Sequence, residues 1–364
     1  MSVSSHRLFH VDALKALAAQ LIVLHHLSVY GPVAQAMHEL LPALSELLFH
    51  YGRMAVQVFL VLGGYLSARG LSARGGLLSG HPLELLWRRY LRLALPFMAA
   101  VLLTLACSEL VEDALPELVP QDVSLAQLLS HALLMHGVLG HEALTVGAWY
   151  VAIDFQLFGL LLGLLWLVRS AAGLPRAWRM LLGPGLVLLL CAASLYGFNL
   201  MPELDHLALY FFGAYGLGAM VHWLSLSRYP RLALAGLGLL AGGALVLAFR
   251  ERALLAALTA AVLAAWQLRP TLSQCFAARA RLARLLAHHS QHSYALFLVH
   301  FPIVLLLNAW VEPQDQPLGA WAAVYLLAAW LLSNVAALPF YRWIEAPAAR
   351  LRLKAAAPIA ALQR

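Results

Sequence analysis

The sequence predicts an all-α membrane protein, a polytopic bundle of about ten transmembrane helices. Of its 364 residues, 62% are hydrophobic and 11% are charged, and the mean hydropathy is +0.78, which is far more apolar than a water-soluble domain. The apolar residues form runs of about twenty, rich in Leu, Ala, Val and Gly, the length that a helix needs to cross a bilayer. An outer-membrane barrel is excluded, because its strands would need short alternating segments.

Ten stretches have the length and composition of a span. The first starts near Asp12 and has no small-residue cleavage site at its end, so we expect it to stay in the protein as a span. The third carries Arg88, Arg89 and Arg92 at its start and the ninth contains His300, which makes these two the least hydrophobic. The predicted spans are 12–30, 46–67, 88–110, 145–168, 181–199, 206–224, 232–249, 252–269, 292–311 and 319–341.

The basic residues indicate how the spans are oriented. In an alternating ten-span arrangement nearly all Arg and Lys fall on one side and most acidic residues on the other, with Arg250 and Arg252 as exceptions in a short turn. Because basic residues stay on the cytoplasmic side, we expect both termini to be cytoplasmic. The acidic connection 111–144 would then be the longest external one, with at most a short surface helix. Topology also accounts for the net charge of +7, so no nucleic-acid partner is expected.

The chain reads as one membrane domain over residues 1–354, followed by a frayed tail at 355–364. We find no appended soluble domain and no internal repeat of the kind that marks inverted-repeat transporters.

Ionisable residues inside the spans are costly and therefore mark candidate functional positions. Lys15 and His26 are eleven residues apart, which places them on one face of the first helix with about 16 Å of rise between them. Asp154 on the fourth span and Arg53 on the second are expected to reach the depth of His26. We expect Asp154 to orient His26 as a general base while Arg53 balances the buried charge or steadies an oxyanion. The alternative is a polar cluster that only fixes helix packing.

Other polar positions also have two interpretations. Arg88, Arg89 and Arg92 suit phosphate groups, or they anchor the third helix at the cytoplasmic surface. His300 lies mid-membrane, where spacing alone favours a core residue over a ligand-binding one. His25 faces about 100° away from His26 and is expected to serve packing. The segment "FYRWIEAP" near the last span is expected to form a local helix-end network, and Gly63-Gly64 and similar pairs are expected to permit close helix packing.

Six motifs occur in order along most of the chain. They are "RLFHVDALKALAAQLIVLHH", "GRMAVQVFLVLGGYLSAR", "WRRYLRLALP", "AWYVAIDFQLF", "SYALFLVHFP" and "FYRWIEAP". Together they resemble the acyltransferase 3 family of integral membrane acyltransferases. Three positions depart from the family's pattern: Lys15 stands where Arg is usual, Gly63 where Ser is common, and Asp154 where Glu is usual.

The resemblance implies transfer of an acyl group, commonly acetyl from acetyl-CoA, to a hydroxyl of a carbohydrate, lipid-linked glycan or other exported acceptor. It implies a multi-pass protein of a bacterial inner membrane, in contact with membrane lipid, with no metal; an oligomer is compatible with it. The candidate catalytic residues are His26, Asp154 and Arg53, and the candidate acyl-CoA-binding residues are Lys15, Arg88, Arg89, Arg92 and His300. A transporter or flippase for a lipid-linked or anionic solute is the main alternative, because buried charges also line permeation paths, and a non-catalytic scaffold is a third.

Overall fold

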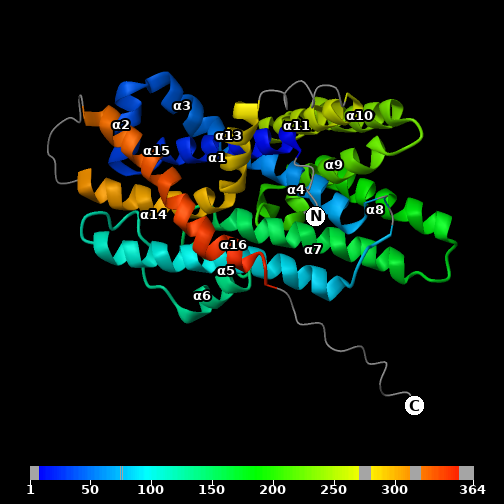
Figure 1. Ribbon diagram of the computed structural model, residues 1–364, viewed down its shortest axis with the longest axis horizontal. Coiled ribbons are helices and arrows are strands. Elements are labelled where there is room, and N and C mark those ends of the chain that lie inside the picture. The colour runs from blue at the N-terminus through cyan, green and yellow to red at the C-terminus, as the bar shows by residue number, and fades with distance from the viewer. Residues whose placement is uncertain (1–7, 74, 76, 270–279, 312–320, 352–364) are drawn as a thin grey trace, which may run out of the picture.

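A computed structural model describes residues 8–73, 75, 77–269, 280–311 and 321–351 (Figure 1). Regular structure in these ranges is entirely helical, which confirms the predicted all-α class. The predicted tail at 355–364 lies outside the described residues. The main helices are α1 (Phe9–Leu27), α2 (Gly31–Leu40), α3 (Pro42–Tyr51), α4 (Val56–Leu71), α5 (Pro82–Val111), α6 (Leu125–Ala132), α7 (Ala148–Ser170), α8 (Arg176–Tyr196), α9 (Ala208–Ser225), α10 (Pro230–Leu247), α11 (Glu251–Leu268), α13 (Ala280–Gln291), α14 (Ser293–Val311) and α15 (Trp321–Phe340).

A helix occupies each of the ten predicted stretches, and eight of the described helical segments are long and apolar enough to cross a membrane. The number is nine if α1 and α2, which meet at 100°, form one broken span. The second crossing joins α3 to α4 through the 3₁₀ turn η1 (Gly52–Ala55). Helix α9 is not among the eight; it is buried along almost its whole length and contains Tyr, Gly and His residues that lower its hydropathy.

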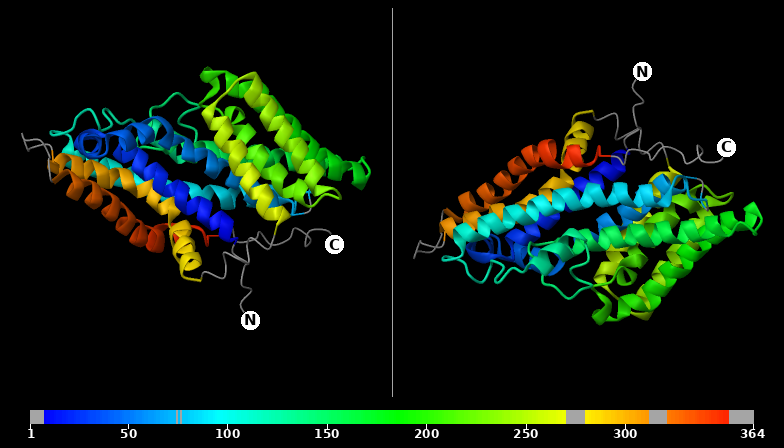
Figure 2. Two further views of the ribbon diagram at one scale, coloured as in Figure 1. Left: turned by 90° about the horizontal axis from the view of Figure 1, so that it is seen from above. Right: turned by 90° about the horizontal axis from the view of Figure 1, so that it is seen from below.

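Helices α4 and α9 form the centre of the bundle because glycine lets their backbones touch. A Cβ atom on Gly64 would overlap the carbonyl oxygen of Tyr215, and one on Gly218 would overlap that of Val61. The expected role of the Gly63-Gly64 pair in close packing is therefore confirmed. Figure 2 shows α1, α14 and α15 on one side of this centre and α8, α10 and α11 on the other.

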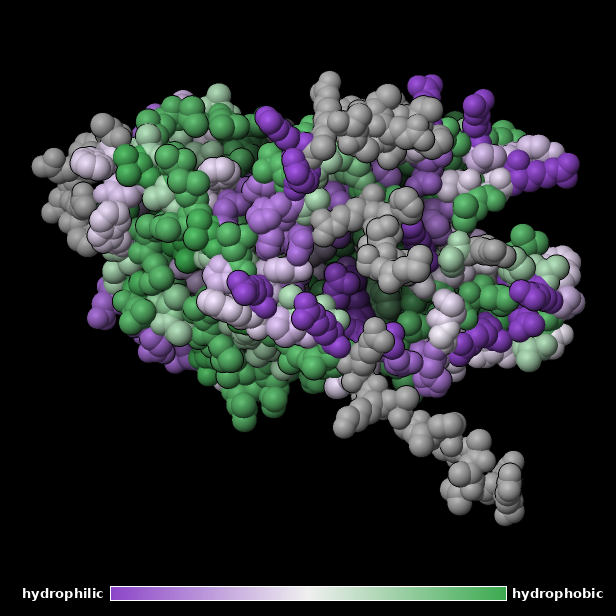
Figure 3. Space-filling model, viewed as in Figure 1, coloured by the Kyte–Doolittle hydropathy of each residue, from purple (hydrophilic) through white to green (hydrophobic). Residues whose placement is uncertain are grey.

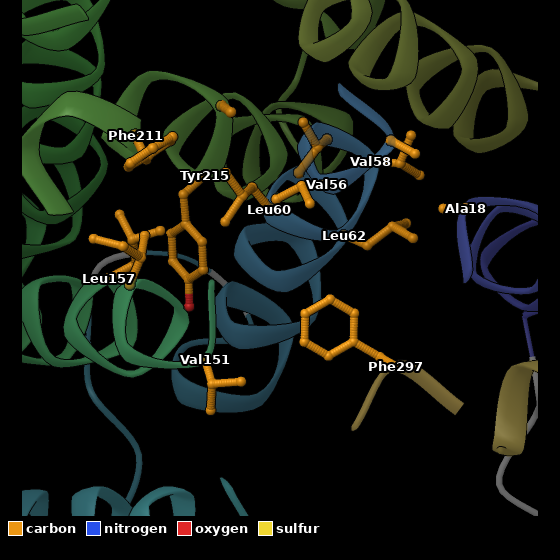
Figure 4. Close-up of a cluster of buried hydrophobic side chains, with 14 of the residues drawn as sticks. Ala18, Val56, Val58, Leu60, Leu62, Val151, Leu157, Phe211, Tyr215 and Phe297 are labelled. Atoms are coloured by element: carbon orange, nitrogen blue, oxygen red, sulfur yellow. The ribbon is translucent and has the colours of Figure 1, made fainter. Parts of the chain in front are cut away.

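The core around α4 and α9 also receives side chains from α7 and α14. In Figure 4, Leu60 and Leu62 of α4 lie among Tyr215 of α9, Leu157 of α7 and Phe297 of α14. These residues come from four helices that are distant in the sequence. Their packing fixes the positions of the helices that form the walls of the cavity described below.

The connection between α5 and α7 differs from the expected external loop. Helix α6 and the segment after it pack along α5: the hydroxyl of Tyr90 donates to the carbonyl oxygen of Ala132 at 2.8 Å, and the hydroxyl of Thr104 donates to that of Thr145 at 3.0 Å. Tyr90 and Thr104 are about 21 Å apart along α5, so the connection returns deep into the bundle. The sequence does not indicate this packing, because the acidic residues in the first part of the connection dominate the mean hydropathy of 111–144.

Candidate functional site

A cavity of about 370 Å³ lies where α1, α4, α5, α7 and α14 meet, close to the ends at which α1, α5 and α14 begin. We call this the inner end; it is the end that the sequence predicts to be cytoplasmic. Most of the wall is apolar, but five charged side chains also line it: Lys15, Arg89, Arg92, Asp154 and Glu345. In Figure 3, hydrophilic residues gather in the middle of the molecule around a hollow beside α16 (Ala346–Ala348), whereas the α14 and α15 side is hydrophobic.

Arg89 and Asp154 form an ion pair in the cavity wall. The Asp154 side chain is 5% exposed and that of Arg89 is 21% exposed. The guanidinium of Arg89 also lies over the ring of Phe158, 5.3 Å from its centroid and one turn beyond Asp154 on α7. This arrangement fixes a buried carboxylate and a cation at the junction of α5 and α7.

The ion pair corrects the expected grouping of His26, Asp154 and Arg53. Arg53 lies on η1 and is exposed, so it does not balance the charge of Asp154. Helix α5 begins at Pro82, which carries Arg89 about 10 Å into the helix and within reach of α7. The prediction that Arg89 lies at the mouth of the helix is therefore wrong, because Arg89 lies deep enough to pair with Asp154.

The three arginines of "WRRYLRLALP" separate into three environments. Arg88 is exposed and pairs with Glu84, one turn earlier on the same helix, so its side chain is engaged outside the cavity. Arg89 is held by Asp154. Arg92 lines the cavity, as does Lys15, and neither makes an ion pair with any described residue. Among the described residues, the cavity therefore offers two cations that are not held in an ion pair and can meet an anionic ligand.

Glu345 was expected to serve a helix-end network, but the structure places it in the cavity wall. It is the last residue of a π-helical turn, η4 (Tyr341–Glu345), which follows Pro339 of α15. The side chain is buried, and its Oε2 atom has no hydrogen-bond partner among the described residues. Single π turns occur often at functional sites, because the extra residue rotates the following side chains.

His26 and His300 contact each other outside the residues that line the cavity. Nδ1 of His26 lies 2.7 Å from Nε2 of His300, and the two rings are nearly parallel, with an interplanar angle of 10°. His300 is fully buried, whereas His26 is partly exposed. Phe297 connects the two regions: it lines the cavity, and its ring centroid is 6.2 Å from that of His300. His300 thus takes the place of Asp154, the partner expected for His26, and no pattern in the sequence pairs two residues 274 positions apart.

His25 has the packing position that its helical phase predicts. Its Nδ1 atom lies 2.8 Å from the carbonyl oxygen of Leu48, and the side chain is buried. Gly52 packs directly on it, since a Cβ there would lie 2.7 Å from Cβ of His25.

Comparison with known proteins gives one match. A family model described as an acyltransferase domain matches residues 9–337. No curated protein and no solved structure matches the chain. Within the described ranges, no group of three or more His, Cys, Asp or Glu side chains is placed to hold a metal ion.

Proposed function

The chain belongs to the acyltransferase 3 family, and from this premise we propose that it transfers an acyl group, in the simplest case acetyl, from acyl-CoA to a hydroxyl of a carbohydrate or lipid-linked glycan. Membership makes the protein a membrane acyltransferase. The donor, the acceptor and a bacterial inner-membrane location are our proposal.

The observation that carries the donor assignment is the pair of cations in the cavity, Lys15 and Arg92, that make no ion pair with a described residue. Lys15 and Arg92 line it from different helices, and Arg89 adds a third positive group already held by Asp154. CoA carries several phosphate groups, for which guanidinium and ammonium groups are the usual partners. A volume of about 370 Å³ lies within the range of about 300–1,000 Å³ that small-ligand sites occupy.

The position of the cavity supports the same donor. It lies near the inner end, which the basic residues predict to face the cytoplasm, where acyl-CoA is available. The apolar wall that includes Phe59, Leu62 and Phe297 would accept the pantetheine arm and direct the thioester toward the histidine pair.

In the proposed reaction His26 is the general base. Its imidazole takes the proton of the acceptor hydroxyl while the hydroxyl oxygen forms a bond to the thioester carbonyl carbon. The C–S bond then breaks, and the leaving CoA thiolate receives the proton from the imidazolium. Atoms and charge balance without a metal or a redox partner.

The decisive experiment supplies radiolabelled acetyl-CoA to the purified protein in lipid nanodiscs and measures CoA release with and without carbohydrate acceptors. We expect acceptor-dependent release. In parallel, mass spectrometry of surface glycans from cells with and without the gene should reveal the loss of an acyl mass. Intact acetyl-CoA in every assay, combined with solute movement in protein-containing vesicles, would instead establish a transporter.

A further inference from the structure

We propose that His300 is a positioning residue that holds His26 in the tautomer with its proton on Nδ1, so that Nε2 is the atom that accepts the proton from the acceptor. The proposal rests on the acyl-transfer function proposed above, in which His26 is the base. It assigns His300 to the orientation of the base and not to the binding of CoA.

The surroundings of His300 determine which nitrogen carries its proton. Nδ1 of His300 lies 3.2 Å from the carbonyl oxygen of Leu296, which can only accept a hydrogen bond. A neutral imidazole has one N–H and one lone pair, so a proton on Nδ1 leaves the lone pair on Nε2. The opposite tautomer would place two lone pairs 3.2 Å apart in a fully buried site.

The tautomer of His300 then determines that of His26. Nε2 of His300, now an acceptor, lies 2.7 Å from Nδ1 of His26, so Nδ1 must carry the proton and donate it. The nearly parallel ring planes allow this N–H to lie along the lone-pair direction of its acceptor. The order of donation is therefore His26 to His300 to the Leu296 carbonyl.

This order leaves Nε2 of His26 with a free lone pair. Among the described residues it has no hydrogen-bond partner, and the His26 side chain is partly exposed, so Nε2 can meet a hydroxyl. The ring is held on its other sides by the rings of His25 and Tyr30, whose centroids lie 5.0 and 5.7 Å away.

In this arrangement the neutral side chain of His300 has the role that a carboxylate has in many hydrolases. A hydrogen-bond acceptor on Nδ1–H fixes the tautomer and stabilises the imidazolium that forms when Nε2 takes a proton. Because His300 is neutral, no negative charge has to be buried beside His26. Its position on α14, outside the cavity lining, predicts that it affects the chemical step and leaves acyl-CoA binding unchanged.

The first test reads the tautomer directly. Long-range ¹H–¹⁵N correlation spectra of histidine-labelled protein in nanodiscs distinguish the two neutral tautomers, and comparison with His26→Gln identifies the His26 signals among the 16 histidines. We expect His26 to carry its proton on Nδ1 in the wild type and to show both tautomers in His300→Leu. A proton on Nε2 in the wild type would overturn the proposal whether or not the protein transfers acyl groups.

The second test separates the chemical step from binding. In Gln the amide oxygen can reach the position of Nε2, so His300→Gln should keep kcat within about tenfold of wild type, whereas His300→Leu should lower it about 10²-fold, within the contribution of a general base. The KM for acyl-CoA should stay unchanged in both. A raised KM with unchanged kcat would overturn the proposal and make His300 a donor-binding residue. A wild type with the Nδ1 tautomer but no acyl transfer would overturn the proposed function alone.

Discussion

Gly63 of α4 faces the carboxylate of Asp154 of α7: a Cβ on Gly63 would lie 3.4 Å from Oδ1 of Asp154 and 3.1 Å from the ring of Tyr215. These two residues are the positions at which the chain has Gly for the common Ser and Asp for the usual Glu of its family. The two positions that differ from the family's pattern are thus in contact. A substitution at one of them changes the volume and the polarity of the surroundings of the other.

This contact predicts that Gly63→Ser and Asp154→Glu are not additive. Each single change disturbs a wall that is fitted to the other residue, and the serine Cβ also presses on Tyr215. A double-mutant cycle on turnover and on thermal stability should give a coupling of about 0.5–3 kcal/mol, as for residues in contact. Additivity within about 0.3 kcal/mol would show that the two departures are independent.

Asp154 is expected to act mainly as the partner of Arg89. Asp154→Asn keeps the volume but leaves the guanidinium without its counter-charge, which should destabilise the protein by about 3 kcal/mol, the lower end of the cost of breaking a buried pair. Adding Arg89→Gln removes the stranded cation, so the double variant should regain stability without regaining activity. Thermal unfolding in nanodiscs measures both. A double variant no more stable than Asp154→Asn would mean that the charge of Asp154 serves another partner.

His26 and His25 should differ in their effect on turnover. His26→Ala is expected to lower acyl transfer about 10²–10⁴-fold, the contribution of a general base, and to cost about 1–3 kcal/mol of stability, because Nε2 of the buried His300 loses its donor. His25→Ala removes one of the two hydrogen bonds that the Leu48 carbonyl accepts, the other coming from the backbone N–H of Gly52, and should cost about 0.5–1.5 kcal/mol of stability while turnover persists. Turnover and melting curves of the two variants provide the comparison. Retained activity in His26→Ala would remove it from the role of base.

The sequence was sufficient for the helical class, the order of the helices and the different directions in which His25 and His26 point, because these depend on composition and on the 100° step of a helix. It could not give the rotation of one helix relative to another. That rotation sends Arg89 into the cavity and leaves Arg88 outside it, although the two are adjacent in the chain.

Depth was the second quantity that spacing could not supply. Helix α5 has 30 residues, more than a bilayer requires, so positions counted from an assumed surface were wrong for Arg89. Near the C-terminal end of the described chain, the π turn that ends at Glu345 shifts the helical phase by one residue, and no feature of the composition marks this turn.

The two cavity cations that make no ion pair with a described residue, Lys15 and Arg92, should control acyl-CoA affinity. Arg92→Gln and Lys15→Met are expected to weaken binding about tenfold or more, and less at high salt, because charge-assisted contacts with phosphate are screened. Arg88→Gln is the matched control: it lies on the same helix but pairs with Glu84 outside the cavity, so affinity should hardly change. Titration of acetyl-CoA at two salt concentrations measures all three. Equal losses of acetyl-CoA affinity in Arg88→Gln and Arg92→Gln would mean that these arginines act only through surface charge.

A histidine pair in the connection between α5 and α7 should make stability depend on pH. His131 is neutral, because its Nδ1 donates to the carbonyl oxygen of Gln127 at 2.8 Å while its Nε2 accepts from the backbone N–H of Leu144 at 3.1 Å. His136 stacks on it with ring centroids 4.1 Å apart, is 2% exposed, and has no described hydrogen-bond partner at either ring nitrogen. Burial, and then the neighbouring His131, lowers the pKa of His136 from 6.5 to about 4.

Between these two pKa values the unfolded chain binds a proton at His136 that the folded protein does not, so the folded state loses stability as the pH falls from about 6.5 toward 4. From pH 7 to pH 5 the loss due to this residue should be about 2 kcal/mol, and below about pH 3, where His136 is protonated in both states, it should not grow further. Melting temperatures of the wild type and of His136→Phe, measured in nanodiscs at both pH values, test this. The variant is expected to show the smaller decrease, because Phe cannot bind the proton in either state. Parallel decreases in the two proteins would assign the acid sensitivity to other groups.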